Sequence, residues 1–391
     1  MDPGPACAES GGQGQVNLLY VTVVLCAPGT ATCQTIDHVQ VDTGSYGLRL
    51  IAQALQPAFA SALPIVKESQ SGQPLVECTQ FADGYSWGPI RMADVQIAGE
   101  KASGIGVQII GDPSYSQVPA GCQSNGTQED TVATFGANGI LGVGPFVQDC
   151  GTVCASGSQG SNPFYYVCSS PSSCIGSTVA LNQQISNPVA FFTNSSNAVA
   201  DNNGVIVQLP SLPAGGAPTV QGQMIFGIDT EPNNTSASAS YVLLGDLNTG
   251  EITTLFNGGT LTQSYIDSGS NALYFVDGSL RACVTNMGFY CPLSEASLSA
   301  TNEGTSGTPQ STVNFSVGDA DSLAGANSAF DDLAGCPVSA SGGSGCPASS
   351  PTFDWGIPFF FGRSVYTAIA CNIDGATCAK TSVGYGPYFA Y

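Results

Sequence analysis

The segments HVQVDTGSYGL (38–48) and QSYIDSGSNAL (263–273) decide the fold of this chain. Each is an apolar strand pattern that ends in an aspartate and continues with Thr or Ser, then Gly-Ser, then a short stretch ending in Leu. A single triplet of this kind is common in ordinary turns, where the Asp caps the backbone. Two copies behind apolar strands, one in each half of a 391-residue chain, indicate two related lobes that contribute one Asp each.

The two aspartates, Asp42 and Asp267, form a pattern suited to general acid–base chemistry. The glycine in each motif lets the backbone approach closely, so two facing loops bring the carboxylates together. Like charges at such a distance cannot both ionise easily, so the pair shares a proton and its pKa values split. One carboxylate then activates water while its protonated partner polarises the scissile carbonyl, which predicts a bell-shaped profile favouring acid pH. This chemistry requires no metal ion, cofactor or covalent intermediate.

The residues that follow each aspartate are predicted to support it. Thr43 and Ser268 place a hydroxyl beside each carboxylate, where it suits bracing of one loop against the other. Ser45 and Ser270 are placed to hydrogen-bond the outer carboxylate oxygens. Together with the two glycines, the predicted supporting set is Thr43, Gly44, Ser45, Ser268, Gly269 and Ser270.

Composition favours a β-rich protein with more than one core. A single hydrophobic core rarely serves more than about 250–300 residues, so 391 residues favour two lobes. Only 9% of residues are charged, against about 25% in typical soluble domains, and 49 Gly and 24 Pro favour strands and turns over long helices. With 28 acidic and 7 basic residues, the net charge of -21 will not attract nucleic acid or anionic lipid. This acidic composition favours solubility outside the cell, or tolerance of acid.

The 15 cysteines predict disulfides and an oxidising compartment, namely the periplasm, the cell surface or the medium. Several pairs close short loops, and no C-x2-C pair of the zinc type is present, with His38 as the lone histidine. The odd count leaves one thiol over, for which Cys7 is the candidate. The opening MDPGPACAESGGQGQ lacks the basic and apolar regions of a signal peptide, so we expect that an export signal has been removed. No apolar run is long enough for a membrane-spanning helix.

The pattern along the chain predicts short strands separated by turns. Residues 1–15 are expected to be a disordered tail, residues 16–220 a first lobe and residues 221–391 a second lobe. Strands are expected within 17–27, 35–45, 222–229, 241–247 and 260–270, and a hairpin within 95–110. Short helices are expected near 51–63, 187–193 and 278–286, with a cross-linked loop at 146–185 and a loose Ser/Gly-rich stretch at 298–350.

Beyond the two motifs, the sequence resembles the pepsin-like aspartic proteases over about residues 16–391, with the elements in the family's order. The matching segments are FADGYSWGPIRMADVQIAG (81–99), similar to the flap hairpin, GANGILGVGP (136–145), GQMIFGID (222–229), FDWGIPFFFGRSVYTAI (353–369) and GYGPYFAY (384–391). The chain also looks like divergent, secreted bacterial members of unknown function. The resemblance implies a bilobal, all-β double barrel with a few short helices, a central cleft between the lobes, and an aspartic endopeptidase acting on an extended polypeptide. A monomer is the family-like expectation.

Two departures from the family pattern bear on substrate binding. The resemblance assigns the flap tip to Phe81, Ala82, Asp83 and Gly84, and Phe81 stands where the family has a tyrosine, so a hydroxyl is missing. Arg49 stands where the family has a tryptophan, either lining a subsite and selecting acidic side chains or serving a structural role. These changes leave open an alternative in which the same scaffold is a non-catalytic binding or inhibitor-like protein of the cell envelope.

Overall fold

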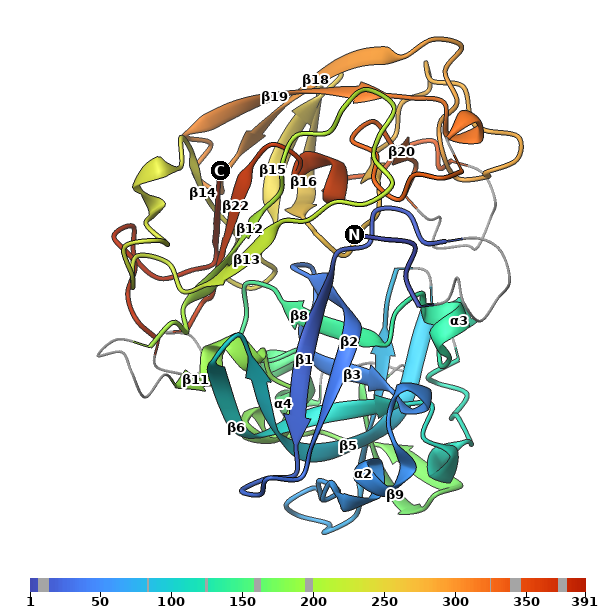
Figure 1. Cartoon of the computed structure of the whole chain (residues 1–391), viewed down its shortest axis with the longest axis vertical. Coiled ribbons are helices and arrows are strands. Elements are labelled where there is room, and N and C mark those ends of the chain that lie inside the picture. The colour runs from blue at the N-terminus through green and yellow to red at the C-terminus, as the bar shows by residue number, and fades with distance from the viewer. Residues whose placement is uncertain are drawn as a thin grey trace.

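The computed structural model of the chain describes residues 1–5, 14–82, 84–123, 126–157, 163–193, 200–323, 325–337, 346–371 and 378–391. It has two β-rich lobes, one coloured blue to green and the other yellow to red in Figure 1. Within the described ranges, no helix is both long and apolar enough to cross a lipid bilayer.

The first lobe is a closed ring of six strands. In ring order these are β1 (Tyr20–Cys26), β2 (Cys33–Asp42), β8 (Gly139–Val143), β3 (Tyr46–Ile51), β6 (Glu100–Ile110) and β5 (Gly84–Ile97), which pairs back to β1. Alternating residues of these strands, such as Val23 and Leu25 of β1, are fully buried inside the ring. The ring is closed because β5 is long enough to pair with both β1 and β6.

Further strands and short helices extend this lobe. The added strands are β4 (Leu75–Gln80), β7 (Thr127–Gln128), β9 (Tyr165–Ser170), β10 (Ser173–Gly176) and β11 (Phe192–Thr193). The α-helices are α2 (Pro57–Ala62), α3 (Val132–Phe135) and α4 (Gly151–Ser156). The 3₁₀ helices of the described chain are η1 (Ala52–Ala54), η2 (Pro113–Tyr115), η3 (Leu181–Gln183), η4 (Pro188–Phe191), η5 (Ser236–Ser238), η6 (Ala320–Ser322) and η7 (Ile357–Phe359).

The second lobe is built on a seven-stranded sheet with an aromatic core. Its strands, in spatial order, are β19 (Gln310–Val317), β18 (Ala296–Glu303), β15 (Ile252–Phe256), β16 (Gly259–Ile266), β21 (Asp354–Trp355), β17 (Leu273–Tyr274) and β20 (Ala334–Gly335). Phe275 stacks on Phe353 at 4.8 Å between ring centroids, and Phe353 stacks on Trp355 at 4.2 Å. Such ring pairs add about 0.5–1.5 kcal/mol each beyond their burial.

A five-stranded sheet joins the two lobes. Its order is β13 (Gln223–Phe226), β12 (Gly204–Gln208), β22 (Ser364–Ala368), β23 (Tyr388–Ala390) and β14 (Val242–Leu244). Phe226 of this sheet packs edge-on against Phe192 of the first lobe, with centroids 4.9 Å apart. The boundary expected at 220/221 falls between the paired strands β12 and β13, and the division of the chain into domains there stays a prediction.

Most of the expected strands are present. The segments 17–27, 35–45 and 95–110 contain β1, β2 and the β5–β6 hairpin, and the helical segment 51–63 contains η1 and α2. The stretch 298–350 was expected to be loose, but eight-residue strands β18 and β19 begin it and pair throughout. The loop expected at 146–185 contains α4 and the β9–β10 hairpin.

The prediction of a helix at 278–286 was wrong, because this segment forms a loop that a disulfide closes. Cys283 pairs with Cys291, and the Asp321 carboxylate accepts hydrogen bonds from the backbone N–H groups of Val284, Thr285 and Asn286. A carboxylate that accepts three amide hydrogens satisfies these groups without the helical ladder.

Seven disulfides pair fourteen of the fifteen cysteines. The predicted short-loop pairs are among them, namely Cys26–Cys33, Cys283–Cys291, Cys336–Cys346 and Cys371–Cys378. The cysteine expected to be left over, Cys7, lies outside the described residues. The disulfides are consistent with an oxidising, extracellular compartment.

The first residues of the chain differ from the disordered tail expected over 1–15. The Met1 amino group donates to the Val220 carbonyl at 2.7 Å, and the Gln15 amide donates to the Pro3 carbonyl at 2.9 Å. Met1 is also 9% exposed, so it packs into the core. Residues 6–13 of the expected tail lie outside the described chain.

Candidate active site

The two motif aspartates stand at equivalent places in the two lobes. Asp42 is the last residue of β2, which pairs in parallel with β8, and Asp267 follows β16, which pairs in parallel with β21. The Asp267 amide donates to the Trp355 carbonyl at 3.1 Å. Each aspartate is therefore presented at the carboxyl end of a strand that is held from the side by a second strand.

The two loops are braced by a reciprocal set of hydrogen bonds. The Thr43 hydroxyl donates to the Ile266 carbonyl at 3.1 Å and accepts from the Ser268 amide at 2.9 Å. The Ser268 hydroxyl donates to the Val41 carbonyl at 2.8 Å and accepts from the Thr43 amide at 3.1 Å. Both side chains are buried, so water does not compete for these hydrogen bonds, and they fix one loop relative to the other.

The motif glycines bring the two carboxyl groups together. A Cβ on Gly44 would lie 2.6 Å from the Asp267 Cγ, and a Cβ on Gly269 would lie 2.5 Å from the Asp42 Oδ1. Each carboxyl therefore lies directly against the opposite glycine, in space that any side chain would fill. The Gly44 amide donates to Asp42 Oδ1 at 2.6 Å, and the Gly269 amide donates to Asp267 Oδ1 at 2.7 Å.

The electrostatics of this pair keep a proton on it. Burial, then the charge of Asp42, then that of Asp354 raise the pKa of Asp267 well above its usual range. Burial, then the charges of Asp42 and Asp267, raise the pKa of Tyr46, which therefore stays a neutral phenol. Since two like charges in one buried site cannot both ionise easily, the two carboxyl groups share a proton.

The two predicted supporting serines behave differently. The Ser270 hydroxyl donates to Asp267 Oδ2 at 3.0 Å, as expected. The expectation that Ser45 would hydrogen-bond Asp42 was wrong, because the buried Ser45 Oγ has no hydrogen-bond partner. The Ser45 backbone carbonyl accepts a hydrogen bond from the Gly144 amide at 2.9 Å.

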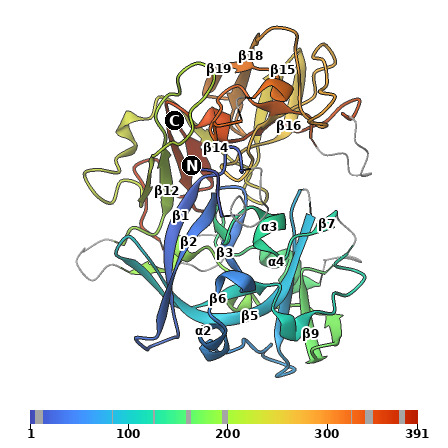
Figure 2. The ribbon, with the colours of Figure 1, turned by 45° about the vertical axis from the view of Figure 1, so that its right-hand side comes forward.

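The flap hairpin expected from the sequence is formed by β4 and β5, and it stands beside β7 (Figure 2). At its tip, the Phe81 amide donates to the Gly84 carbonyl at 2.8 Å, and Ala82 is exposed. Asp83 lies outside the described residues. The Phe81 ring packs edge-on against Phe135, with centroids 5.9 Å apart, so the side chain in the tyrosine position makes an apolar contact within its own lobe.

Arg49 has the structural role that was one of its two predicted alternatives, and the alternative that it lines a subsite and binds substrate was wrong. Its side chain is 2% exposed and is ion-paired with Glu77 Oε1 at 2.5 Å and Asp149 Oδ2 at 3.0 Å. It also donates to the Thr79 hydroxyl and to the Tyr46 carbonyl. Arginine occupies this interior position because two carboxyl groups and two further oxygens satisfy its donors.

Sequence reasoning missed Asp354, a third buried carboxyl at this site. It is 4% exposed and lies on β21, where it pairs with Tyr265 of β16. Tyr265 precedes Asp267 by two residues. Burial is the main cause that raises the pKa of Asp354 well above its usual range; a Ser270 hydrogen bond opposes the rise and the charge of Asp42 adds to it. The sequence signal was present, since Asp354 is the lone charged residue within the apolar run FDWGIPFFF.

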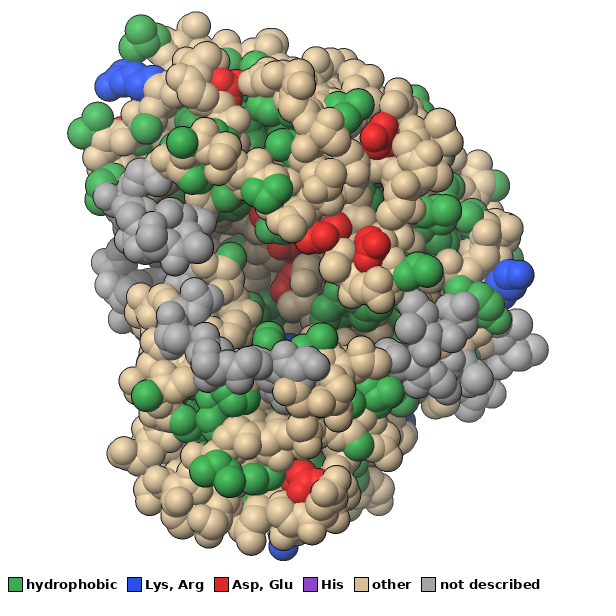
Figure 3. Space-filling view, turned by 180° about the vertical axis from the view of Figure 1, so that it is seen from behind, with side chains coloured by type: hydrophobic (Ala, Val, Ile, Leu, Met, Phe, Trp, Pro, Cys, Tyr) green, Lys and Arg blue, Asp and Glu red, His purple; other side chains and the backbone are tan. Residues whose placement is uncertain are grey.

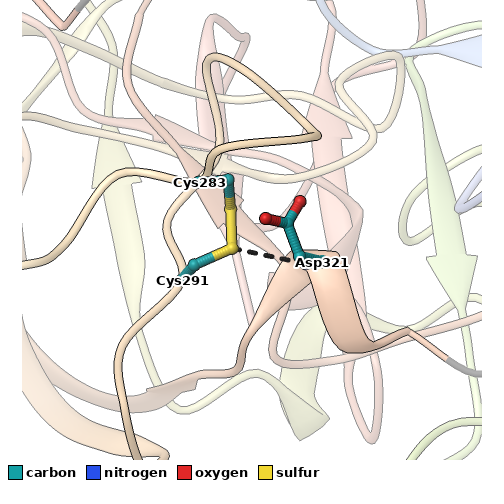
Figure 4. Close-up of side chains that lie close together, drawn as sticks. All are labelled: Cys283, Cys291 and Asp321. Atoms are coloured by element: carbon teal, nitrogen blue, oxygen red, sulfur yellow. Dashed lines mark hydrogen bonds between the residues drawn. A yellow bond between two sulfur atoms is a disulfide. The ribbon is translucent and has the colours of Figure 1, made fainter.

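Away from the aspartate pair, Cys283, Cys291 and Asp321 lie close together and are residue types that can bind metals (Figure 4). Their chemistry does not fit a metal ion. The two sulfur atoms form a disulfide of 2.03 Å, and the Asp321 amide donates to the Cys291 sulfur at 3.3 Å. Cysteine binds a metal ion as its thiolate, which a disulfide does not offer. The cluster therefore braces a loop.

The surface is hollowed between the two lobes, and acidic and apolar side chains face this hollow (Figure 3). A separate cavity of about 640 Å³ lies in the second lobe, between the β18–β19 hairpin and η7. Its lining includes Glu295, Asp332 and Arg363 but neither aspartate of the pair.

Two β-rich lobes, with an aspartate loop from each meeting at a braced pair, have the architecture of a pepsin-like fold. In agreement, the crystal structure of aspartic proteinase from Irpex lacteus is similar to this chain, with a TM-score of 0.52 and 14% sequence identity, covering 96% of this chain and 94% of that chain. At this identity, the likeness shows the fold alone. The chain belongs to the family described as Protein of unknown function (DUF3443), whose model matches residues 6–391. No curated protein matches it.

Proposed function

We propose that this protein is an aspartic endopeptidase that hydrolyses peptide bonds at acid pH. The observation that carries the proposal is the pair Asp42 and Asp267, each carboxyl lying against the glycine of the opposite loop. A fold alone does not fix a function, so the proposal rests on the chemistry of this pair.

In the proposed mechanism, Asp267 holds the shared proton and donates it toward the carbonyl oxygen of the scissile bond. Asp42, as the carboxylate, removes a proton from the attacking water. The Thr43 and Ser268 bracing contacts hold the two groups in place through the reaction, and the Ser270 hydroxyl orients Asp267. No metal or covalent intermediate enters these steps.

The proposed substrate is an extended polypeptide. It would lie in the hollow between the lobes and pair with the flap hairpin by strand-like hydrogen bonds, near Phe81, Ala82 and Gly84. At pH 7 such a substrate would meet a protein with a formal net charge of -21, which favours neutral and basic segments over acidic ones near neutral pH. We propose that the protein acts as a monomer, either secreted or at the periplasmic or cell-surface side.

The experiment that tests this proposal is digestion of a diverse peptide pool between pH 3 and pH 7, with the cut sites read by mass spectrometry. Cuts that appear at acid pH with wild-type protein and vanish with Asp42→Asn are the expected result. Cuts that persist in Asp42→Asn would show that the pair is not the catalyst.

One observation favours a second candidate, a non-catalytic protein that binds polypeptide in the same hollow. The residue in the flap tyrosine position, Phe81, packs against Phe135 and offers no hydroxyl. A folded wild-type protein that retains peptides without cutting them at any pH would support this function.

A further inference from the structure

Asp354 faces the aspartate pair because of the alternation of β21. Its neighbours Phe353 and Trp355 stack on each other in the aromatic core, so the residue between them points to the opposite face of the strand. β21 pairs in parallel with β16, and Asp354 is in register with Tyr265. Residues two apart on a strand share a face, so Asp354, Tyr265 and Asp267 lie on the same side of the sheet.

The donors around Asp354 do not supply enough hydrogen bonds for an ionised carboxylate. The Ser270 hydroxyl donates to Asp267 Oδ2 at 3.0 Å, and Asp354 is within hydrogen-bonding reach of the same hydroxyl. A hydroxyl has a single hydrogen, so Ser270 cannot satisfy two ionised carboxylates at once. The other oxygen of Asp354, Oδ1, is buried and has no hydrogen-bond partner. An ionised carboxylate in this position would be costly, and a bound proton removes that cost.

We propose that Asp354 is a third carboxyl group of this site, joined to Asp267 through the Ser270 hydroxyl, and that it is a positioning residue which keeps the proton of the Asp42–Asp267 pair in place to higher pH. This inference rests on the proposed function, and it adds to the two-carboxylate mechanism a residue that does not touch the substrate.

The charged groups that face Asp354 are acidic and favour retention of a proton, whereas the hydrogen bond from Ser270 opposes it. From β16 come Tyr265 and, just beyond the strand, Asp267; Asp42 comes from the other lobe, and Tyr274 faces it from β17. The charge of Asp354 is the first cause that raises the pKa of Tyr265, so the phenol gives no negative charge of its own. Among the described residues, no Lys or Arg is ion-paired with Asp354.

Replacement of Asp354 by a neutral residue should therefore let the pair lose its proton more easily. Once Asp354 ionises, its charge raises the pKa of Asp267, so the pair gives up its proton later; a nearby like charge is worth roughly one unit or more. In Asp354→Asn, the basic limb of the pH dependence of kcat/KM should move to lower pH by about one unit. Asp354→Leu, which also lacks hydrogen-bonding atoms, should move it in the same direction.

The matched control is Asp277→Asn, since Asp277 is a buried aspartate of the same lobe that bonds Ser279 and Asn257, away from the pair. Its basic limb should stay at the wild-type pH. A basic limb that is unchanged in both Asp354 variants would overturn the proposal, as would an equal shift in the control.

A second readout does not depend on peptidase activity. The infrared C=O band of protonated carboxyl groups, measured at pH 6 to 7 on folded protein, should lose intensity in Asp354→Asn and not in Asp277→Asn. If wild-type protein cuts no peptide, the proposed function fails, while loss of this band still supports a protonated third carboxyl. Retention of the full band in Asp354→Asn would overturn the inference whether or not the protein is a peptidase.

Discussion

The buried ion pairs of Arg49 give a stability prediction of definite size. The substitution Arg49→Met keeps an unbranched apolar side chain but removes the charged guanidinium group that lies 2.5 Å from Glu77 and 3.0 Å from Asp149. Asp149 carries less of the cost than Glu77, because burial and then the charge of Glu77 raise its pKa. Glu77, which is 0% exposed, is left as an unpaired buried carboxylate. Breaking a buried pair in this way costs about 3–5 kcal/mol, so Arg49→Met should lose this much stability at pH 7.

The assay is chemical unfolding with the disulfides intact, followed by circular dichroism at pH 7. The double variant Arg49→Met/Glu77→Gln serves as the control, because replacing both partners of a buried pair by uncharged groups is often close to neutral. It should recover most of the loss. A loss below about 1 kcal/mol in the single variant, or a loss that the second substitution does not reduce, would refute this reasoning.

Three further predictions concern the site and its frame. Gly269→Ala places a Cβ 2.5 Å from the opposite carboxylate oxygen and should lower kcat/KM by at least about 100-fold, whereas Gly278→Ala, which points into open space, should not change it. Loss of the Cys78–Cys122 disulfide, which spans 44 residues next to the flap, should cost about 4 kcal/mol of unfolding free energy in a double Ser variant. Burial raises the folded-state pKa of Asp267 above its unfolded value, so the stability that this group contributes is present at low pH and is lost as the pH rises. The free energy of unfolding of Asp267→Asn, relative to that of the wild type, should therefore increase from pH 3 to pH 7. A constant difference between the two proteins would contradict the raised pKa.

The sequence was sufficient to predict the architecture because its strongest signals are local. The repeated strand–Asp–Gly motif places one aspartate at the end of β2 and the other just after β16, and the closely spaced cysteines predicted most disulfides. By contrast, the β18–β19 hairpin was missed because Ser, Thr and Asn occupy its exposed positions. Its strands are held by pairing along their whole length, which composition does not reveal.

The errors at the site arose where tertiary contacts override residue type. The sequence left Arg49 with two alternatives, a subsite or a structural role, because its ion-pair partners Glu77 and Asp149 come from distant parts of the chain. Ser45 and Ser270 occupy equivalent places in the two motifs, and only Ser270 bonds its aspartate. Asp354 joins the site through a strand more than 80 residues away from Asp267, a pairing that the sequence pattern alone does not show.

The central claim is that Asp42 and Asp267 act as one unit. The most direct measurement is kcat/KM at pH 4 for a cut peptide, with wild type, Asp42→Asn, Asp267→Asn and the double variant, each checked for retained fold. Groups that act together are strongly non-additive, so each single variant should lose at least about 1,000-fold and the double variant should lose no more than either single. Losses that multiply in the double variant, or a single variant with near wild-type activity, would contradict the account.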